Sequence, residues 1–250
     1  MGYVIALAGK GGTGKTTIAS LIVRILKEKK LGSIIAIDAD PNSNLAEALG
    51  IETKQNIGLI LDDIGSNPEI IPVNMGKDAY IEYRVQTAIA EGKGFDLLIM
   101  GRPEGPGCYC YVNNVLRNCM AKIIKNYNFV IIDNEAGLEH LSRKTTREAD
   151  SLLVISDSSI AGLKAAKRIA QLRRELDIKI KNEFLIINRF SGSIDKKMVS
   201  ETKLTYLGSL GLDKEIEDAS TKDGCLSCLG SNNISIKILS KLGEKIWHCN

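Results

Sequence analysis

The chain has 250 residues, 44% of them hydrophobic and 25% charged, with a formal net charge of +3, which predicts one α/β domain over residues 1–250. The weak charge gives no indication of a nucleic-acid partner, and no stretch approaches the roughly 18 apolar residues of a membrane span, so a membrane partner is not expected. No positive region precedes the first apolar run, and we therefore expect a cytoplasmic protein whose six cysteines are mostly reduced.

The first expected element is an apolar strand over residues 3–8 that opens into a glycine-rich loop. Residues 9–16 fit G-x-x-x-x-G-K-[ST], in which glycines let backbone N–H groups converge on phosphate oxygens. Lys15 would place its ammonium against the β- and γ-phosphates of ATP, and the Thr16 hydroxyl would bind the bridging Mg²⁺. The residues expected to contact the nucleotide here are Gly9, Lys10, Gly11, Gly12, Thr13, Gly14, Lys15, Thr16 and Thr17.

Lys10 adds a second cation inside this loop. A cation so close to the phosphates either assists catalysis in its own subunit or reaches a partner's nucleotide, as an arginine finger does. A solvated loop lysine is the alternative. We expect Lys10 and Lys15 to be catalytic residues.

Apolar spacing predicts alternating helices and strands along the rest of the chain. Helices are expected over 18–29, 112–123, 160–176 and 234–247, and strands over 33–37, 95–100, 128–132, 151–156, 183–187 and 205–209. This alternation predicts a single doubly wound, mostly parallel sheet with helices on both faces. Residues 51–93 show weak helical patches and no clear strand, and are interpreted as an insertion without assigned structure. The amphipathic segment 234–247 is expected to pack on the sheet, with a membrane-surface helix as the alternative.

Three aspartates lie where predicted strands end. Asp133 follows four apolar residues, and a carboxylate in that position can order Mg²⁺ directly or through water, with a helix cap as the alternative. Asp40 is our candidate for positioning or deprotonating the attacking water, against an Asp-Pro turn without chemistry. Asp38 is expected to support the Mg²⁺ shell. The carboxyl ends of parallel strands are where such sheets bind ligands.

The cysteines include two close pairs. Cys108 and Cys110 lie in a Gly/Pro-rich loop, where their thiolates could share a metal or be unrelated small side chains. Two such pairs facing each other across a dimer axis would supply four thiolates, a set that suits Zn²⁺ or Ni²⁺. Cys225 and Cys228 form a C-x-x-C pair that could chelate metal, form a redox disulfide or be incidental.

The loop sequence GKGGTGKTT resembles the deviant Walker A motif of the MinD, ParA and nitrogenase iron protein superfamily. This resemblance implies a homodimer that forms face to face around two ATP molecules, with Lys10 crossing to the partner's nucleotide. It also implies that Asp40 is catalytic, and that Asn188 and Arg189 contact adenine. Relatives carry a Pro-x-Asp segment near the base, whereas this chain has Leu-Gly-Leu-Asp at residues 210–213, which leaves the second adenine contact open.

Two further segments, GRPEGPGCYCYVNNVLR and DNEAGLEHLSR, are similar to those of CooC-type ATPases, which mature the nickel enzymes carbon monoxide dehydrogenase and acetyl-CoA synthase. The resemblance extends from Gly2 to at least Arg189. It implies a metallochaperone that dimerises with ATP, holds Ni²⁺ or Zn²⁺ at Cys108 and Cys110, and serves a client nickel enzyme. A MinD-like positioning ATPase and an iron–sulfur ATPase are the alternatives, although the cluster cysteine of an iron protein is absent from DNEAG.

Overall fold

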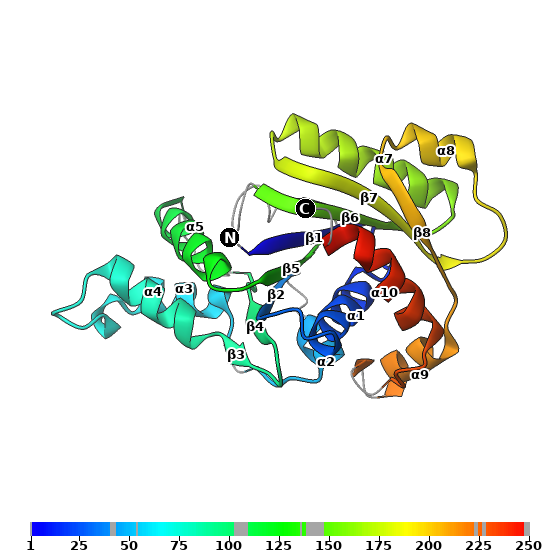
Figure 1. The fold of residues 1–250 in the computed structure, drawn as a ribbon. Helices are drawn as coiled ribbons and strands as arrows, with labels where there is room; N and C mark the ends of the chain where they lie inside the picture. Colours follow the sequence, from blue (N-terminus) through cyan, green and yellow to red (C-terminus); the bar gives the residue numbers. More distant parts are fainter. Residues whose placement is uncertain are drawn as a thin grey trace.

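The computed structural model describes residues 2–40, 44–53, 55–102, 110–135, 137–138, 148–222, 225–226 and 229–247, with the backbone alone for 110–113 and 222. Within these residues, eight strands form one sheet in the order β3-β4-β2-β5-β1-β6-β7-β8 (Figure 1). Every pairing is parallel except that of β3 with β4. The strands are β1 (Tyr3–Gly9), β2 (Ile34–Ala39), β3 (Ala90–Glu91), β4 (Asp96–Ile99), β5 (Phe129–Asn134), β6 (Glu148–Ser156), β7 (Lys179–Phe190) and β8 (Thr205–Gly211). The predicted doubly wound, mostly parallel sheet is confirmed.

Helices cover both faces of the sheet, and each face has its own apolar core. One core joins the sheet to α1, α2 and α10, and the other joins it to α3, α4, α5 and α7. The helices are α1 (Lys15–Glu28), α2 (Leu45–Leu49), α3 (Ile57–Ser66), the short 3-10 helix η1 (Pro68–Ile70), α4 (Lys77–Thr87), α5 (Cys110–Lys125), α7 (Ile160–Glu175), α8 (Lys196–Glu201), α9 (Lys214–Lys222) and α10 (Ile234–Trp247).

The central strands are apolar along their length because both of their faces are covered. Ile5 and Leu7 of β1 are fully buried against the α1 face, while Ala6 and Ala8 are buried against the opposite face. Side chains alternate between the two faces of a strand, so a continuous apolar run is the pattern of a strand with no solvent-exposed face. The same reasoning explains why residues 34–37 and 130–132 could be recognised as strands from sequence.

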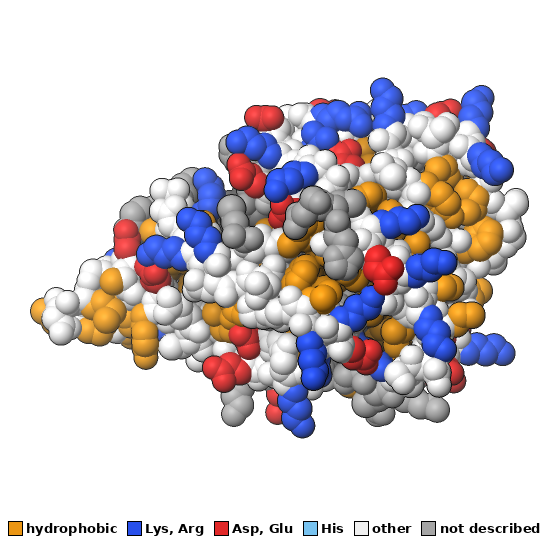
Figure 2. Space-filling model, viewed as in Figure 1, with side chains coloured by type: hydrophobic (Ala, Val, Ile, Leu, Met, Phe, Trp, Pro, Cys, Tyr) orange, Lys and Arg blue, Asp and Glu red, His pale blue; other side chains and the backbone are white. Residues whose placement is uncertain are grey.

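Helices α3 and α4 form an arm within the region 51–93, for which the sequence shows only weak helical patches. The arm extends from the β3–β4 edge of the sheet (Figure 1). It is anchored where Gly58 N–H donates to the Met100 carbonyl at 2.9 Å, and a Cβ at Gly58 would lie 2.7 Å from the Arg102 backbone. Leu59, Val73 and Tyr83 are exposed, and hydrophobic side chains gather at the outer end of the arm (Figure 2). The expectation that this region has no strand is corrected by β3.

The amphipathic segment 234–247 is a packed helix, as expected. Leu239, Ile246 and Trp247 of α10 are at most 4% exposed in the core shared with α1. At the start of the helix, Ile234 is 67% exposed while Ile236 is buried. Since most of its apolar stripe is covered, α10 does not present the free apolar face that a membrane-surface helix requires.

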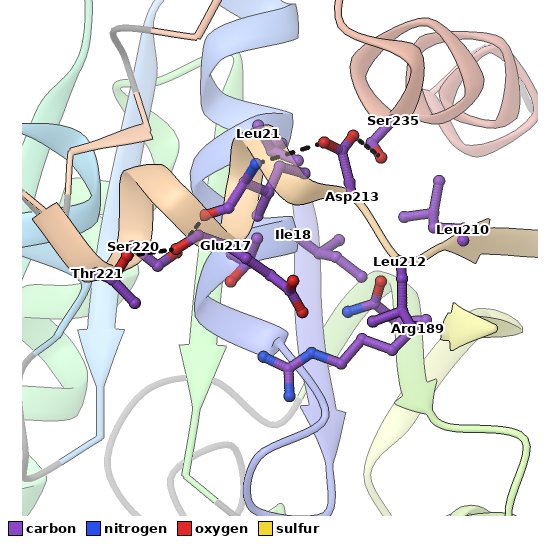
Figure 3. A pocket seen from close by; sticks show the side chains of 14 residues that line it. Ile18, Leu21, Arg189, Leu210, Leu212, Asp213, Glu217, Ser220, Thr221 and Ser235 are labelled. Carbon is purple, nitrogen blue, oxygen red and sulfur yellow. Dashed lines mark hydrogen bonds between the residues drawn. The ribbon is translucent and has the colours of Figure 1, made fainter. Parts of the chain in front are cut away.

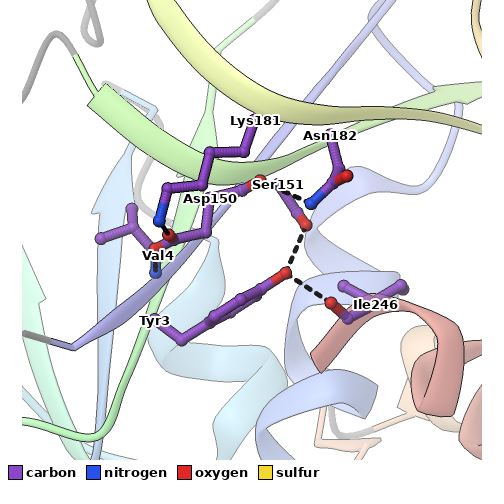
Figure 4. Close-up of polar contacts among 7 residues, drawn as sticks. All are labelled: Tyr3, Val4, Asp150, Ser151, Lys181, Asn182 and Ile246. Carbon is purple, nitrogen blue, oxygen red and sulfur yellow. Dashed lines mark hydrogen bonds and ion pairs between the residues drawn. The ribbon is translucent and has the colours of Figure 1, made fainter. Parts of the chain in front are cut away.

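A polar cluster at the amino ends of the strands fastens α10 to the sheet (Figure 4). The Tyr3 hydroxyl donates to the Ile246 carbonyl and shares a hydrogen bond of 2.8 Å with the Ser151 hydroxyl. Asp150 accepts from Val4 N–H at 2.8 Å and pairs with Lys181 at 2.6 Å. The cluster lies at the edge opposite the phosphate loop, so it stabilises the sheet without contacting the candidate site.

None of the helices in the described ranges is both long and apolar enough to cross a membrane.

Candidate nucleotide-binding site

The glycine-rich loop joins β1 to α1, and its shape depends on particular glycines. Gly12 and Gly14 have φ angles of +80° and +89°, a region that side chains with a Cβ rarely adopt. A Cβ at Gly9 would lie only 2.2 Å from the Ile155 carbonyl oxygen of β6. Thr13 closes the loop, because its hydroxyl donates to the Lys10 carbonyl at 2.8 Å. These features fix the conformation of the loop that precedes α1. The backbone N–H groups at the start of this helix can then bind an anion.

The two loop lysines lie in opposite environments. Lys15 begins α1 and is only 7% exposed, whereas Lys10 is exposed at the outer side of the loop. Thr16 and Thr17 follow in the first turn of α1 and are half-buried. This placement brings the Lys15 charge to the carboxyl edge of the sheet and leaves Lys10 accessible from outside the subunit.

Asp38 and Asp133 lie side by side at the ends of β2 and β5. The two residues are partners in the parallel register, and they are 0% and 1% exposed. Their neighbours Ala36 and Ile131, two positions earlier, belong to the core under α1. Because strand residues alternate between faces, both carboxylates point toward the start of α1, where Lys15 and Thr16 lie.

Burial and their mutual proximity make the charged forms of these two carboxylates unfavourable. Burial raises the pKa of Asp38 to about 7, with the Asp133 and Asp40 charges adding to the effect, although Leu45 and Asp40 N–H groups donate to it at 2.9 and 3.1 Å. Burial likewise raises the pKa of Asp133 to about 6, against the hydrogen bond from the Thr16 hydroxyl and the charge of Lys15. Ionised carboxylates in this position need a compensating positive charge.

The donor set fits Mg²⁺. The buried Asp133 Oδ1 has no hydrogen-bond partner, although its residue lies beside Thr16, whose hydroxyl is a suitable second oxygen ligand. The described residues contain no group of three or more His, Cys, Asp or Glu side chains that could hold a metal ion. Mg²⁺ commonly keeps several waters and binds one or two carboxylates together with substrate phosphates, so a complete protein cage is not required.

A pocket of about 360 Å³ continues from the loop along α1 (Figure 3). Its walls come from the start of α1, the end of β7, the link from β8 to α9, and α9 itself. The lining residues are Thr17, Ile18, Leu21, Asn188, Arg189, Leu210, Gly211, Leu212, Asp213, Ile216, Glu217, Ser220, Thr221 and Ser235. Apolar walls from Ile18, Leu21 and Leu210 with polar groups at the rim suit a flat, partly polar ring such as a nucleotide base.

Asn188 and Arg189 connect this pocket to the phosphate loop. The Asn188 side-chain Nδ2 donates to the Thr13 carbonyl at 2.9 Å, and Arg189 Nη1 donates to the Gly12 carbonyl at 3.2 Å. Arg189 has a φ of +52°, and the β7–β8 pairing shifts register between Ile187 and Phe190. The two side chains, which were predicted to contact adenine, thus bond to the phosphate loop at this irregular part of β7.

Asp213, in the segment that departs from the Pro-x-Asp pattern, is occupied by contacts within the protein. Its carboxylate accepts from Glu215 N–H at 3.1 Å, from Asn233 Nδ2 at 3.0 Å and from the Ser235 hydroxyl at 2.6 Å. Sequence reasoning missed α9 and its contribution of Glu217, Ser220 and Thr221 to the pocket. The available signals were the Asp213 cap and the apolar pair Ile216 and Ala219, three residues apart.

The predicted cysteine site lies largely outside the described residues. Cys108 is not among them, and Cys110 is described only as the first backbone position of α5. Cys228 is likewise outside them, whereas Cys225 is half-buried beside Leu226, which packs in the core under α1. Cys119 is 3% exposed in the opposite core, and burial raises the pKa of its thiol, so this cysteine packs as an apolar side chain.

Replacing Gly14 with alanine should displace Asn188 and so break its hydrogen bond to the phosphate loop. A Cβ there would meet Asn188 Nδ2 at 2.4 Å, and the φ of +89° is strained for alanine. We expect ATP affinity measured by calorimetry to fall by at least about tenfold, since the change costs more than about 1.4 kcal/mol. Gly11→Ala is the control for folding, because a Cβ there meets nothing within 4 Å, and its melting temperature should be unchanged. Unchanged ATP affinity in Gly14→Ala would contradict the coupling.

The phosphate loop, the buried aspartates and the adjoining pocket at the carboxyl edge of a parallel sheet define a P-loop nucleotide-binding protein. The family model described as the CobQ/CobB/MinD/ParA nucleotide binding domain matches residues 4–224. The chain therefore belongs to this family of P-loop ATPases.

Relatives and solved structures agree with this assignment. The chain is 42% identical over 248 residues to an uncharacterized ATP-binding protein of Methanocaldococcus jannaschii, covering 97% of this chain and 98% of the relative. It is 30% identical to the carbon monoxide dehydrogenase accessory protein CooC of Rhodospirillum rubrum, covering 86% of each chain. The fold is similar to that of the Pyrococcus furiosus cell division ATPase MinD, with a TM-score of 0.72 at 20% identity over 98% of both chains.

Proposed function

We propose that this protein is an Mg²⁺-dependent ATPase that acts as a metallochaperone: it dimerises with ATP, holds a divalent metal, Ni²⁺ or Zn²⁺, between the two subunits, and supports nickel insertion into a client enzyme. The observation that carries the ATPase part is the alignment of Lys15, Thr16, Asp38 and Asp133 at one edge of the sheet. The similarity to CooC carries the nickel part, with carbon monoxide dehydrogenase or acetyl-CoA synthase as the client.

The pocket favours adenine over guanine. Asn188 uses its Nδ2 on the Thr13 carbonyl, which leaves the side-chain Oδ1 as the group available to a ligand. An acceptor in this place pairs with the 6-amino group of adenine and is repelled by the 6-oxo group of guanine. Arg189 closes the same end of the pocket, while Gly9 to Thr17 bind the triphosphate.

Each residue near the phosphates has a distinct role in the proposed reaction. Mg²⁺, held by Thr16 and Asp133 with support from Asp38, would neutralise charge that develops on the phosphate oxygens. Lys15, nearly buried, neutralises the same region from the protein side. Asp40 is half-buried and donates its N–H to Asp38, which holds its backbone at this edge so that its carboxylate can orient the attacking water.

Metal handling is the part of the function that requires two subunits. Cys108 and Cys110 are the proposed ligands, and two thiolates leave a tetrahedral site half-filled. A two-fold dimer places a residue near the axis beside its own copy, so two chains would complete four thiolates. Lys10, exposed on the outer side of the loop, is then placed to reach the partner's nucleotide. Binding of ATP would thereby control capture and release of the metal ion.

Replacing Lys10 with alanine tests this arrangement. The variant should bind ATP within about threefold of the parent, because the remaining phosphate cradle and Lys15 are intact, but it should remain monomeric with ATP. Light scattering after size-exclusion chromatography, with Asp40→Ala added to both proteins to prevent turnover, gives the mass directly. Lys93→Ala, which removes an exposed lysine near the other end of the sheet, should dimerise as the parent does. A dimer of normal mass in Lys10→Ala would refute the crossing role.

A further inference from the structure

The base end of the pocket is shaped by α9 (Lys214–Lys222). Among the described residues, no strand pairing or disulfide holds this helix in place. Its pocket side carries Glu217, Ser220 and Thr221 (Figure 3). Only Ile216 and Ala219 of α9 pack, partly buried, against the core under α1. A short helix with so little buried apolar surface needs another source of orientation.

That source is a pair of helix caps that bond to each other. Asp213 caps α9, because its Oδ1 accepts from Glu215 N–H at 3.1 Å and Ile216 N–H at 3.4 Å. Asn233 caps α10, because its Oδ1 accepts from Ile236 N–H at 3.1 Å. The Asn233 Nδ2 donates to Asp213 Oδ2 and to Glu215 Oε2, both at 3.0 Å. One amide therefore fixes the first turn of α9 to the first turn of α10.

Ser235 strengthens the same connection. Its hydroxyl donates to Asp213 Oδ2 at 2.6 Å, and Ser235 and Asn233 are only 3% and 5% exposed. Burial raises the pKa of Asp213, but the hydrogen bonds from Ser235, Asn233 and the α9 backbone outweigh burial and hold it below its ordinary value. The Asp213 carboxylate is ionised and saturated with internal donors, so it is not available as a ligand for the base.

We propose that Asn233 and Ser235 are positioning residues of the nucleotide site: acting through Asp213, they lock α9 to α10 and so set the width of the pocket that receives the base. This inference rests on the proposed ATP binding. In this arrangement Asp213 does not contact the base itself, but holds α9 in position. Helix α10 in turn supports the base pocket. The far end of α10 is anchored to the sheet by the hydrogen bond from the Tyr3 hydroxyl to the Ile246 carbonyl.

Comparing two ligands separates positioning from general stability. Inorganic triphosphate occupies only the phosphate loop, whereas ATP also needs the base pocket. Asn233→Ser keeps an N-cap acceptor for α10 but removes both donors to α9. We expect its ATP affinity to fall about five- to tenfold and its triphosphate affinity to stay within twofold of the parent, both measured by calorimetry at fixed Mg²⁺. Asn233→Asp should weaken ATP further, because it places a carboxylate against Asp213 and Glu215.

The matched control is Asp195→Ala, which removes the cap of α8, where Asp195 accepts from Lys197 and Met198 N–H at 3.0 and 3.1 Å. Asp195→Ala should lose about as much stability as Asn233→Ser does. Its ratio of ATP affinity to triphosphate affinity should nevertheless equal that of the parent. Parental ATP affinity in both Asn233 variants, or equal losses for ATP and triphosphate, would overturn the inference. A parent protein that binds ATP no tighter than triphosphate would overturn the proposed nucleotide site itself, and the inference with it.

Discussion

Replacing Asp40 with alanine is expected to lower the ATP turnover rate by at least about 100-fold while leaving ATP affinity within about threefold. The variant loses the carboxylate that is proposed to orient the attacking water. It keeps the loop, Lys15, Asp38 and Asp133, which are the proposed binding groups for the triphosphate and Mg²⁺. Phosphate release under saturating ATP measures the rate. Because dimerisation precedes hydrolysis in the proposed cycle, the variant should also accumulate as an ATP-bound dimer.

The control for Asp40→Ala is Glu47→Ala, which removes an exposed carboxylate from α2, seven residues further along the chain. Its turnover should match that of the parent, so a general effect of lost negative charge can be recognised. Parental turnover in Asp40→Ala would show that water is oriented by another group. Asp38 is another described carboxylate at this edge, and its two oxygens already accept from Leu45 and Asp40 N–H.

Replacing both Cys108 and Cys110 with serine is expected to abolish binding of the dimer-held metal ion and maturation of the client. Serine hydroxyls are poor ligands for Ni²⁺ and Zn²⁺ compared with thiolates, and removing all four sulfurs of the proposed site leaves no protein ligand there. ATP affinity should be unchanged because the phosphate loop is intact. Equilibrium dialysis with each metal and a calorimetric titration with ATP provide the two readouts.

The second cysteine pair supplies the matched control. Cys225→Ser with Cys228→Ser removes the same number of thiols from a different segment of the chain and should leave the metal ion in place. Retention of the ion in the Cys108/Cys110 variant together with its loss in this control would move the metal site to the C-x-x-C segment. The ATPase part of the proposed function would be unaffected by that outcome.

The sheet and the phosphate edge could be predicted from the sequence because their signals are local. Continuous apolar runs identify strands with two covered faces, and each run delivered its terminal residues, Asp38 and Asp133 among them, to the same edge. Strand β7 was predicted too short, beginning at Glu183 instead of Lys179. Its first residues alternate between exposed and half-buried positions, and they pair with Glu148 to Ser151 of β6 through backbone hydrogen bonds that side-chain hydrophobicity does not record.

The arm and α9 were not assigned from the sequence, because their local signals are weak and tertiary contacts do much to determine them. α3 is anchored by a backbone bond from Gly58 to Met100, which no periodicity reveals. α9 depends on Asp213 bonding to Asn233 and Ser235, twenty or more residues further along the chain. For Asn188 the sequence predicted a base contact, whereas the structure shows its Nδ2 bonded to the phosphate loop at the Thr13 carbonyl.

The most direct test of the proposed metallochaperone is the nickel stoichiometry of the Asp40→Ala protein with and without ATP. Hydrolysis is prevented by the Asp40→Ala background, and dialysed samples are assayed for metal and for mass. We predict one Ni²⁺ per two chains in the ATP-bound dimer, and at least about tenfold weaker binding without ATP, because a ligand that favours the dimer must favour every other ligand of the dimer. Stoichiometric nickel binding to the monomer, equal with and without ATP, would contradict a metal site formed by nucleotide-driven dimerisation.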